Sequence, residues 1–260
     1  MKHDVVYLLK NNYSEGELLY SLRSVCLNFP FRKIVTVGGC PEYVYPDIKI
    51  EHVQEGSTKW ERSRSSLIKA LECEELTDDI WLFNDDFFVM DKVKVNEDVN
   101  YFRGSLEKTI IDIKRAKPQG SNYINQLERA RGQLLNMGKD ALSFALHVPM
   151  LINREKALAL IRNKNINSIM FRSIYGNYYE IPCRYMKDVK VFDLDSVPDT
   201  SFISTTDLTF RDGKVGEFLR KYFNKPCEYE KSQAERLRDN TRERFDEEGE
   251  IRYENTEPSL

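Results

Sequence analysis

The chain has 260 residues, of which 41% are hydrophobic and 31% charged, and its formal net charge is −3. This length and composition exclude a chain that is disordered throughout and predict a globular protein with a full hydrophobic core. The small net charge neither requires nor excludes a polyanionic partner such as DNA.

Membrane spans and disulfides are not expected. The longest apolar stretch, residues 141–152, is interrupted by Ser143, His147 and Pro149 and is too short to cross a bilayer. The amino terminus has no signal-peptide core, so we expect a soluble, cytoplasmic protein. The five cysteines are odd in number and lack C-x-x-C spacing, which predicts reduced thiols rather than disulfides or a zinc site.

Short apolar runs predict strands in the first third of the chain. These strands are expected over residues 4–9, 33–37, 48–53 and 80–84. The last run begins Ile-Trp-Leu-Phe without polar alternation, as is typical of a strand buried on both faces of a parallel sheet.

Two capping boxes predict the helices between these strands. Ser14 with Glu17 opens the first helix, and Thr58 with Glu61 opens a second that runs to about Leu76. The resulting βαββαβ order predicts a doubly wound sheet whose ligands bind at the carboxyl ends of the strands.

The rest of the chain is predicted to be mainly helical. Residues 100–138 show helical patterns that end at Gly138, and another helix is expected after Asn153. Residues 202–230 are expected to hold a short strand, a turn and a helix from about Gly213 to Phe223. We expect one domain over residues 1–231, with a nucleotide-binding half (1–99) and an acceptor-binding or closing half (100–231). Residues 232–260 carry five arginines against nine acidic residues and predict a charged tail.

Asn84, Asp85 and Asp86 follow the last predicted strand of the first half directly. Two carboxylates about 4 Å apart repel by roughly 4 kcal/mol at an effective dielectric constant of about 20, so the pair favours a divalent cation or a shared proton. Asn84 and Asp86 point to the same side of an extended chain, an arrangement that can hold a metal-bound nucleotide diphosphate. The alternative is a polar β-turn in which these side chains serve the backbone.

Several further segments form an ordered set with this motif. They are Glu17–Val25 with Lys33–Val35, Asn84–Phe88, His147–Pro149, and Phe202–Asp207 with Lys225–Glu230. In order and spacing they resemble the motifs of the Stealth family of sugar-phosphate transferases, which includes bacterial capsule hexose-1-phosphate transferases and the lysosomal-enzyme GlcNAc-1-phosphotransferase. The resemblance implies a GT-A-like α/β fold: a doubly wound, mostly parallel sheet flanked by helices, with helical additions.

Two segments depart from the family pattern. Residues 4–12 lack the tryptophan and the acidic residue of the family's first block, and residues 58–62 replace a Phe-Asn-Ser-x-x-Ile-Glu segment. Both changes fall where a nucleotide would contact the first strand–helix turns. The donor and the bond that is broken are therefore not implied by the resemblance.

The resemblance assigns the chemistry to a few side chains. Asp85 and Asp86 would hold a divalent cation, and His147 would be a catalytic base or a third metal ligand, in which case Mn²⁺ suits the site better than Mg²⁺. The alternative for His147 is a core histidine.

Basic residues are the candidates for contacts with the donor. Arg62 and Arg64 lie at a helix start suited to a phosphate, and Arg172 stands among aromatic residues as a catalytic anion or sugar contact. Lys214 and Arg220 would close over the donor phosphates, and Asn84 would also contact the donor. For each of the helical basic residues the alternative is an ordinary solvated charge.

The sequence therefore predicts a metal-dependent glycosyltransferase that uses a nucleotide-sugar, with UDP-sugar as the expected donor. One alternative is sugar-1-phosphate transfer with release of a nucleoside monophosphate, and another is a noncatalytic carbohydrate- or nucleic-acid-binding protein. A glycopolymer, a protein and a hydroxylated base in DNA all stay open as the acceptor.

Overall fold

The computed structural model describes residues 2–230 except residues 12, 14–15, 94–98, 117–118, 120 and 165–169. Ser14 of the first expected capping box and the expected tail over residues 232–260 lie outside the described residues.

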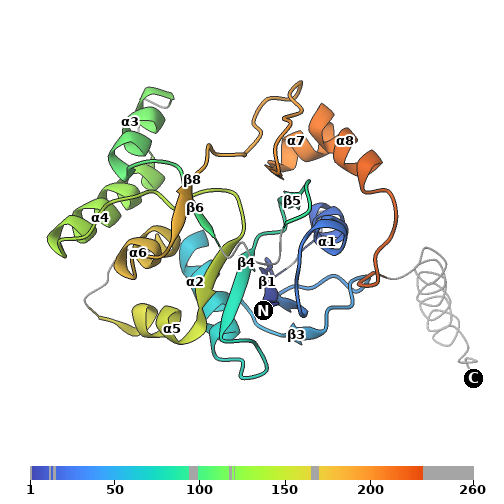
Figure 1. The fold of residues 1–260 in the computed structure, drawn as a ribbon, viewed down its shortest axis with the longest axis horizontal. Helices are drawn as coiled ribbons and strands as arrows, with labels where there is room; N and C mark the ends of the chain where they lie inside the picture. Colours follow the sequence, from blue (N-terminus) through green and yellow to red (C-terminus); the bar gives the residue numbers. More distant parts are fainter. Residues whose placement is uncertain are drawn as a thin grey trace, which may run out of the picture.

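A five-stranded sheet forms the centre of the molecule (Figure 1), with the strand order β3-β2-β1-β4-β7. Its strands are β1 (Asp4–Leu8), β2 (Ile34–Val37), β3 (Ile48–Ile50), β4 (Asp79–Phe83) and β7 (Met150–Asn153). The first four are parallel, and β7 pairs with β4 in the antiparallel sense. The predicted mixed α/β class, with a mostly parallel sheet flanked by helices, is confirmed.

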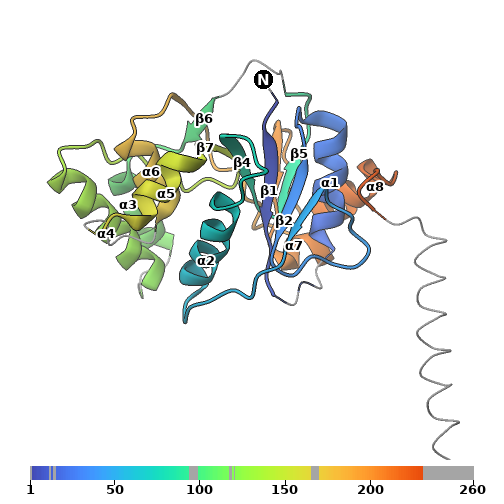
Figure 2. The same cartoon turned by 90° about the horizontal axis from the view of Figure 1, so that it is seen from below.

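Helices cover both faces of this sheet. Figure 2 shows β1 and β2 between α1 (Glu17–Asn28) and α2 (Lys59–Leu71). Val5 and Tyr7 of β1 belong to the apolar cluster that includes α1, whereas Val6 belongs to the cluster that includes α2. Because neighbouring side chains on a strand point to opposite faces, a continuous apolar run serves both cores.

The remaining elements extend the domain on either side. They are β5 (Phe87–Val89), β6 (Asn100–Phe102), α3 (Leu106–Ala116), α4 (Asn122–Asn136), α5 (Arg154–Arg162), α6 (Phe171–Tyr178), β8 (Cys183–Tyr185), β9 (Phe202–Ser204), α7 (Asp207–Asp212) and α8 (Lys214–Tyr222). The strand β5 pairs with β9, and β6 pairs with β8. Figure 1 shows α3 to α6 on one side of the sheet and α7 with α8 at the other end.

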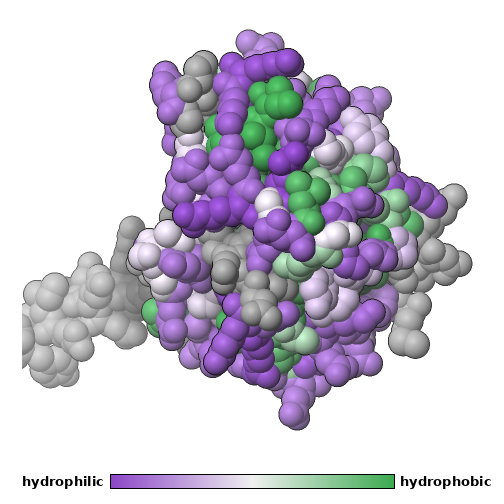
Figure 3. All heavy atoms as spheres, turned by 90° about the vertical axis from the view of Figure 1, so that its left-hand side faces the viewer, coloured by the Kyte–Doolittle hydropathy of each residue, from purple (hydrophilic) through white to green (hydrophobic). Residues whose placement is uncertain are grey.

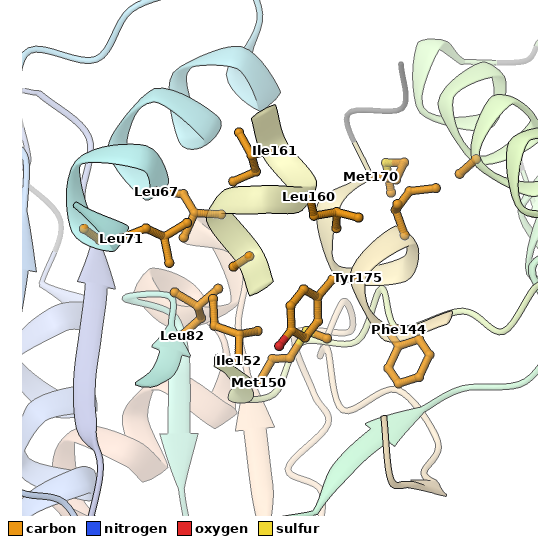
Figure 4. Packing of buried hydrophobic residues seen from close by; sticks show 14 of the residues in the cluster. Leu67, Leu71, Leu82, Phe144, Met150, Ile152, Leu160, Ile161, Met170 and Tyr175 are labelled. Atoms are coloured by element: carbon orange, nitrogen blue, oxygen red, sulfur yellow. The ribbon is translucent and has the colours of Figure 1, made fainter. Parts of the chain in front are cut away.

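The larger apolar cluster joins the central sheet to these helices. Figure 4 shows Leu67 and Leu71 of α2 close to Leu82 of β4 and Ile152 of β7, with Leu160 of α5 in the same cluster. All five side chains are nearly or fully buried. This core fixes α2 and α5 relative to the carboxyl end of β4.

The outer face of the helical part is mainly polar. Figure 3 shows hydrophilic side chains over most of the visible surface, with smaller hydrophobic areas among them. This agrees with the mean hydropathy of −0.56. None of the helices within the described ranges is both long and apolar enough to cross a membrane.

Three predicted elements differ in extent or type. The helix α2 begins at the predicted capping box but ends at Leu71 rather than at about Leu76, because a turn there leads the chain into β4. Residues 100–102 form β6 rather than helix, since they pair with β8. The helix predicted from about Gly213 to Phe223 is observed as α8, but the turn predicted before it opens a further short helix, α7.

Gly216 in α8 packs so closely against α7 that a side chain would overlap the backbone. A Cβ atom at this position would lie 1.8 Å from the carbonyl oxygen of Phe210. We expect Gly216→Ala to lower the free energy of unfolding, measured by urea denaturation, by about 1–3 kcal/mol.

Gly132 in α4 is the matched control. A Cβ atom there would meet no atom within 4 Å, so Gly132→Ala should be neutral or stabilise the helix by up to about 1 kcal/mol. Equal destabilisation by both substitutions would contradict the α7–α8 packing.

Candidate functional site

A cavity lies at the point where the strand order of the sheet reverses. The chain runs from β1 to β2 and β3 on one side and then returns to form β4 on the other side of β1. Doubly wound proteins bind ligands outside the carboxyl ends of the two strands at such a reversal. A cavity of about 220 Å³ is found there, lined by Leu8 at the end of β1 and by Asn84 directly after β4.

Apolar side chains form most of the cavity wall. Figure 4 shows Leu67, Leu160, Ile161 and Met170, all of which line the cavity, on neighbouring helices and the segment that leads into α6. Trp60, in the first turn of α2, adds an aromatic surface. A mainly apolar wall with a few polar groups is typical of a small-molecule site.

Two arginines supply positive charge to this cavity. Arg64 of α2 donates a hydrogen bond to the carbonyl oxygen of Ile161 (2.6 Å), and Arg172 of α6 donates to that of Val148 (2.7 Å). Neither guanidinium forms a salt bridge with a carboxylate of the described residues. Burial lowers the pKa of Arg172 to about 10, although the charge of Asp86 opposes this shift. A cavity with two such cations favours an anionic ligand.

His147 and Asp188 form a hydrogen-bonded pair beside the cavity. The Nδ1 atom of His147 lies 2.9 Å from one carboxylate oxygen of Asp188 and 3.2 Å from the other, and Arg103 donates to Asp188 at 2.7 Å. Burial acts to raise the pKa of Asp188, but the hydrogen bond from His147 and the charges of His147 and Arg103 outweigh it and lower the pKa. An ionised Asp188 holds the proton of His147 on Nδ1, which leaves Nε2 as the nitrogen for proton transfer.

Phe87, the first residue of β5, connects this pair to the cavity. The ring of His147 meets the ring of Phe87 edge-on with centroids 6.5 Å apart, and the guanidinium carbon of Arg172 lies 5.3 Å from the same ring centroid. Arg172 also bonds the carbonyl oxygens of Leu146 and Val148, which flank His147. The structure therefore brings His147 and Arg172 together around Phe87, the residue that follows Asp86.

Asp86 is buried and engaged by two donors. One of its carboxylate oxygens accepts hydrogen bonds from Lys190 (2.5 Å) and from Ser204 of β9 (2.9 Å). The backbone from Asn84 to Phe87 forms the polar turn considered above, with the amide of Phe87 donating to the carbonyl of Asn84 at 3.3 Å. Through this hydrogen bond, Asp86 connects the turn after β4 to the segment around Lys190.

Asp85, on the same turn, faces the segment before α1. Its charge adds to burial in raising the pKa of the phenol of Tyr13, whose oxygen also accepts a hydrogen bond from the amide of Leu18.

The structure does not assemble Asp85, Asp86 and His147 into a three-ligand metal centre. Among the residues that the structure describes, no group of three or more histidine, cysteine, aspartate or glutamate side chains is placed to hold a metal ion. The physical reason is that Nδ1 of His147 faces Asp188 and one oxygen of Asp86 faces Lys190. A metal role for the two aspartates by themselves stays a prediction.

Glu17, at the start of α1, is a buried acid close to this turn. Burial raises its pKa to about 8, and the charges of Asp86 and Asp85 add to the shift, although Thr205 donates a hydrogen bond to it and Lys190 opposes the rise. The folded protein therefore binds a proton that the unfolded chain releases above its ordinary pKa of 4.5. Stability from this group is fully present below pH 4.5 and is lost as the pH rises to about 8.

Glu17→Gln should remove this pH dependence, because an amide does not titrate in this pH range. The amide oxygen can still accept the hydrogen bond from Thr205, so the contact itself is kept. Relative to the variant, the wild type should lose stability between pH 4.5 and 8, with a slope of at most about 1.4 kcal/mol per pH unit. Urea denaturation at a series of pH values measures the difference. Parallel curves for the two proteins would show that Glu17 titrates normally.

The other predicted donor contacts lie elsewhere. Arg62 donates to the carbonyl oxygen of Gly56, Lys214 pairs with Asp195 on the surface, and Arg220 donates to the carbonyl oxygen of Phe210. None of the three lines the cavity, whereas Arg64, Asn84 and Arg172 do. Their present contacts hold a loop or the α7–α8 unit in place.

Asp188, Lys190 and Glu17 were not singled out by the sequence as functional residues. Asp188 is 41 positions from His147, and Lys190 is 104 positions from Asp86. Asp188 and Lys190 lie in the irregular stretch between β8 and β9, which carries no helix or strand pattern. The sequence predicts Glu17 only as part of a capping box. Its burial becomes visible only in the folded structure.

Fold and cavity together define a mixed α/β protein with a mainly parallel sheet and a candidate ligand site at its topological switch point. No known family model matches the chain, and no curated protein matches it. The resemblance to the Stealth family therefore rests on the sequence motifs alone.

Among solved structures, the chain is similar to the apo form of the glycosyltransferase GlyE from Streptococcus pneumoniae TIGR4. The identity is 14% and the TM-score 0.28, and the match covers 55% of this chain and 44% of GlyE. The matched part is thus less than half of the GlyE chain.

Proposed function

We propose that the protein is a glycosyltransferase that moves a sugar from a nucleotide-sugar, with a UDP-sugar as the expected donor, to an acceptor hydroxyl. The observation that supports this most directly is the cavity at the switch point, where Arg64 and Arg172 lack carboxylate partners among the described residues. A nucleoside diphosphate combines the two negative phosphates and the flat base that such a cavity suits. The His147–Asp188 pair is close to the cavity-lining Arg172, which bonds the carbonyl oxygens on both sides of His147.

In this proposal, the guanidinium groups of Arg64 and Arg172 hold the diphosphate and stabilise its charge as it leaves. The Nε2 atom of His147 takes the proton from the acceptor hydroxyl while the acceptor oxygen bonds to the sugar carbon. The bond from that carbon to the diphosphate breaks, and the nucleoside diphosphate leaves. Asp188 positions the imidazole and stabilises the imidazolium that forms.

The metal-dependent form of this reaction, as expected from the sequence, would use a divalent cation at Asp85 and Asp86 to stabilise the charge of the leaving group. Since His147 does not join the two aspartates in a ligand group, we assign no step to the cation.

Sugar-1-phosphate transfer is the second candidate, supported by the motif that places Asn84 to Phe88 and His147 as in the Stealth family. Here the acceptor oxygen, deprotonated by His147, attacks the phosphorus that bears the sugar. The bond between the two phosphates breaks, and a nucleoside monophosphate leaves.

The released nucleotide distinguishes these reactions. The protein is incubated with a panel of nucleotide-sugars and acceptor mixtures containing glycopolymer, protein or hydroxylated DNA, and the nucleotide products are identified by mass spectrometry. Release of a diphosphate supports glycosyl transfer, and release of a monophosphate supports sugar-phosphate transfer. Binding of the donor without any release would instead favour a noncatalytic binding protein.

Acceptor identity follows from the same assay run at increasing salt concentration. If DNA is the acceptor, its apparent affinity should fall steeply with salt because counterions are released on binding. A flat response would reject DNA.

A further inference from the structure

We propose that donor binding requires no divalent cation, because Arg64 and Arg172 neutralise the charge of the donor diphosphate. Asp86 is then the counter-ion of Lys190 rather than a metal ligand. This inference rests on the proposed function, because it concerns the donor of that reaction. It replaces the cation expected from the sequence with side chains of the chain itself.

The first observation is that Asp86 already has hydrogen-bond partners inside the protein. Its carboxylate is bonded by the ammonium of Lys190 and the hydroxyl of Ser204, and the side chains of Lys190 and Asp86 are only 14% and 13% exposed. A cation bound to Asp86 would lie beside an ammonium that is already desolvated, or would have to displace it. Either outcome leaves a poorly solvated positive charge without its partner.

The second observation is the position of the charges relative to the cavity. Arg64 and Arg172 line it, whereas neither Asp85 nor Asp86 belongs to its lining. A diphosphate bound in the cavity would therefore meet the guanidinium groups directly. The two aspartates add negative charge nearby. Within the described part of the chain, no third histidine, cysteine or carboxylate joins them in a group that could hold a metal ion.

The third observation is the capacity of the two arginines for further bonds. A guanidinium has five N–H donors and binds phosphate oxygens in pairs. Arg64 bonds one carbonyl through Nη2, and Arg172 bonds two carbonyls through Nη1. Carbonyl oxygens orient a guanidinium without neutralising it, so both positive charges are available to an anion together with the remaining N–H groups.

Isothermal titration calorimetry tests the inference with UDP, GDP, ADP and dTDP as probes, each in EDTA and in Mn²⁺. We expect at least one nucleotide to bind with the same affinity in both buffers. Arg64→Gln and Arg172→Gln should each weaken that binding by about ten-fold to a hundred-fold, as expected for the loss of a charged hydrogen-bonding group. Arg162→Gln is the control, because Arg162 follows the cavity-lining residue Ile161 in α5 but is paired with Glu72. This variant should bind the nucleotide as the wild type does.

Circular dichroism of each variant separates lost binding from lost folding. If Arg172→Gln fails to fold, Arg64→Gln alone decides the role of the arginines. Binding that appears only with Mn²⁺, or that is unchanged in Arg64→Gln, would overturn the inference while leaving the proposed function intact.

Titration of Mn²⁺ alone provides a readout that needs no nucleotide. We expect no stoichiometric binding, and a single site that disappears in Asp86→Asn would contradict the inference. Absence of binding by every nucleotide in both buffers would overturn the proposed function and this inference with it.

Discussion

Replacing His147 by alanine is expected to lower the turnover number of sugar transfer by about 10²- to 10⁴-fold, the usual contribution of a general base. The reason is the pairing of its Nδ1 with Asp188, which leaves Nε2 to accept the proton of the acceptor hydroxyl. Affinity for the donor should change little, because the cavity is lined by Arg64 and Arg172 and not by His147. Steady-state kinetics with saturating donor measures the effect.

His52→Ala is the matched control for this experiment. His52 bonds Ser65 through Nε2 and does not line the cavity, so its loss should leave turnover unchanged. Asp188→Asn should lower turnover as well and alter its pH profile, because an amide does not hold the imidazolium as a carboxylate does. Full turnover by His147→Ala would remove the histidine from the reaction.

Lys190→Met is expected to lower the free energy of unfolding by about 3–5 kcal/mol, because it leaves a buried carboxylate without its partner. Both members of the Lys190–Asp86 pair are largely shielded from water, with side chains 14% and 13% exposed. Adding Asp86→Asn to this variant should restore part of the loss, since the uncompensated charge is then gone. Urea denaturation of the single and double variants measures both effects.

Lys214→Met is the control for the buried pair. The side chains of Lys214 and Asp195 are 63% and 79% exposed, so water already solvates the aspartate and stability should hardly change. Comparable losses for Lys190→Met and Lys214→Met would show that burial does not strengthen the pair at Asp86.

The parallel part of the fold could be predicted from the sequence because its signals are local. The run from Ile80 to Phe83 has no polar residue, and Thr58 with Glu61 forms the capping box observed at the start of α2. By contrast, β6 was missed because residues 100–102 become a strand only through pairing with β8, about 80 residues later.

The candidate site could be predicted only in part for a related reason. The sequence singled out Asn84, Arg64 and Arg172, which line one cavity, and His147 beside it. The partners that determine what these groups can do are distant in the chain. Asp188 orients His147, and Lys190 forms an ion pair with Asp86, the residue that the sequence predicts as a metal ligand.

A crystal structure of the protein grown with a nucleoside diphosphate in EDTA would locate the donor site. We expect the diphosphate between Arg64 and Arg172, outside the carboxyl ends of β1 and β4, with Lys190 still bonded to Asp86. A nucleotide bound elsewhere on the molecule, or no nucleotide at concentrations that saturate binding in solution, would contradict a donor site at the switch point.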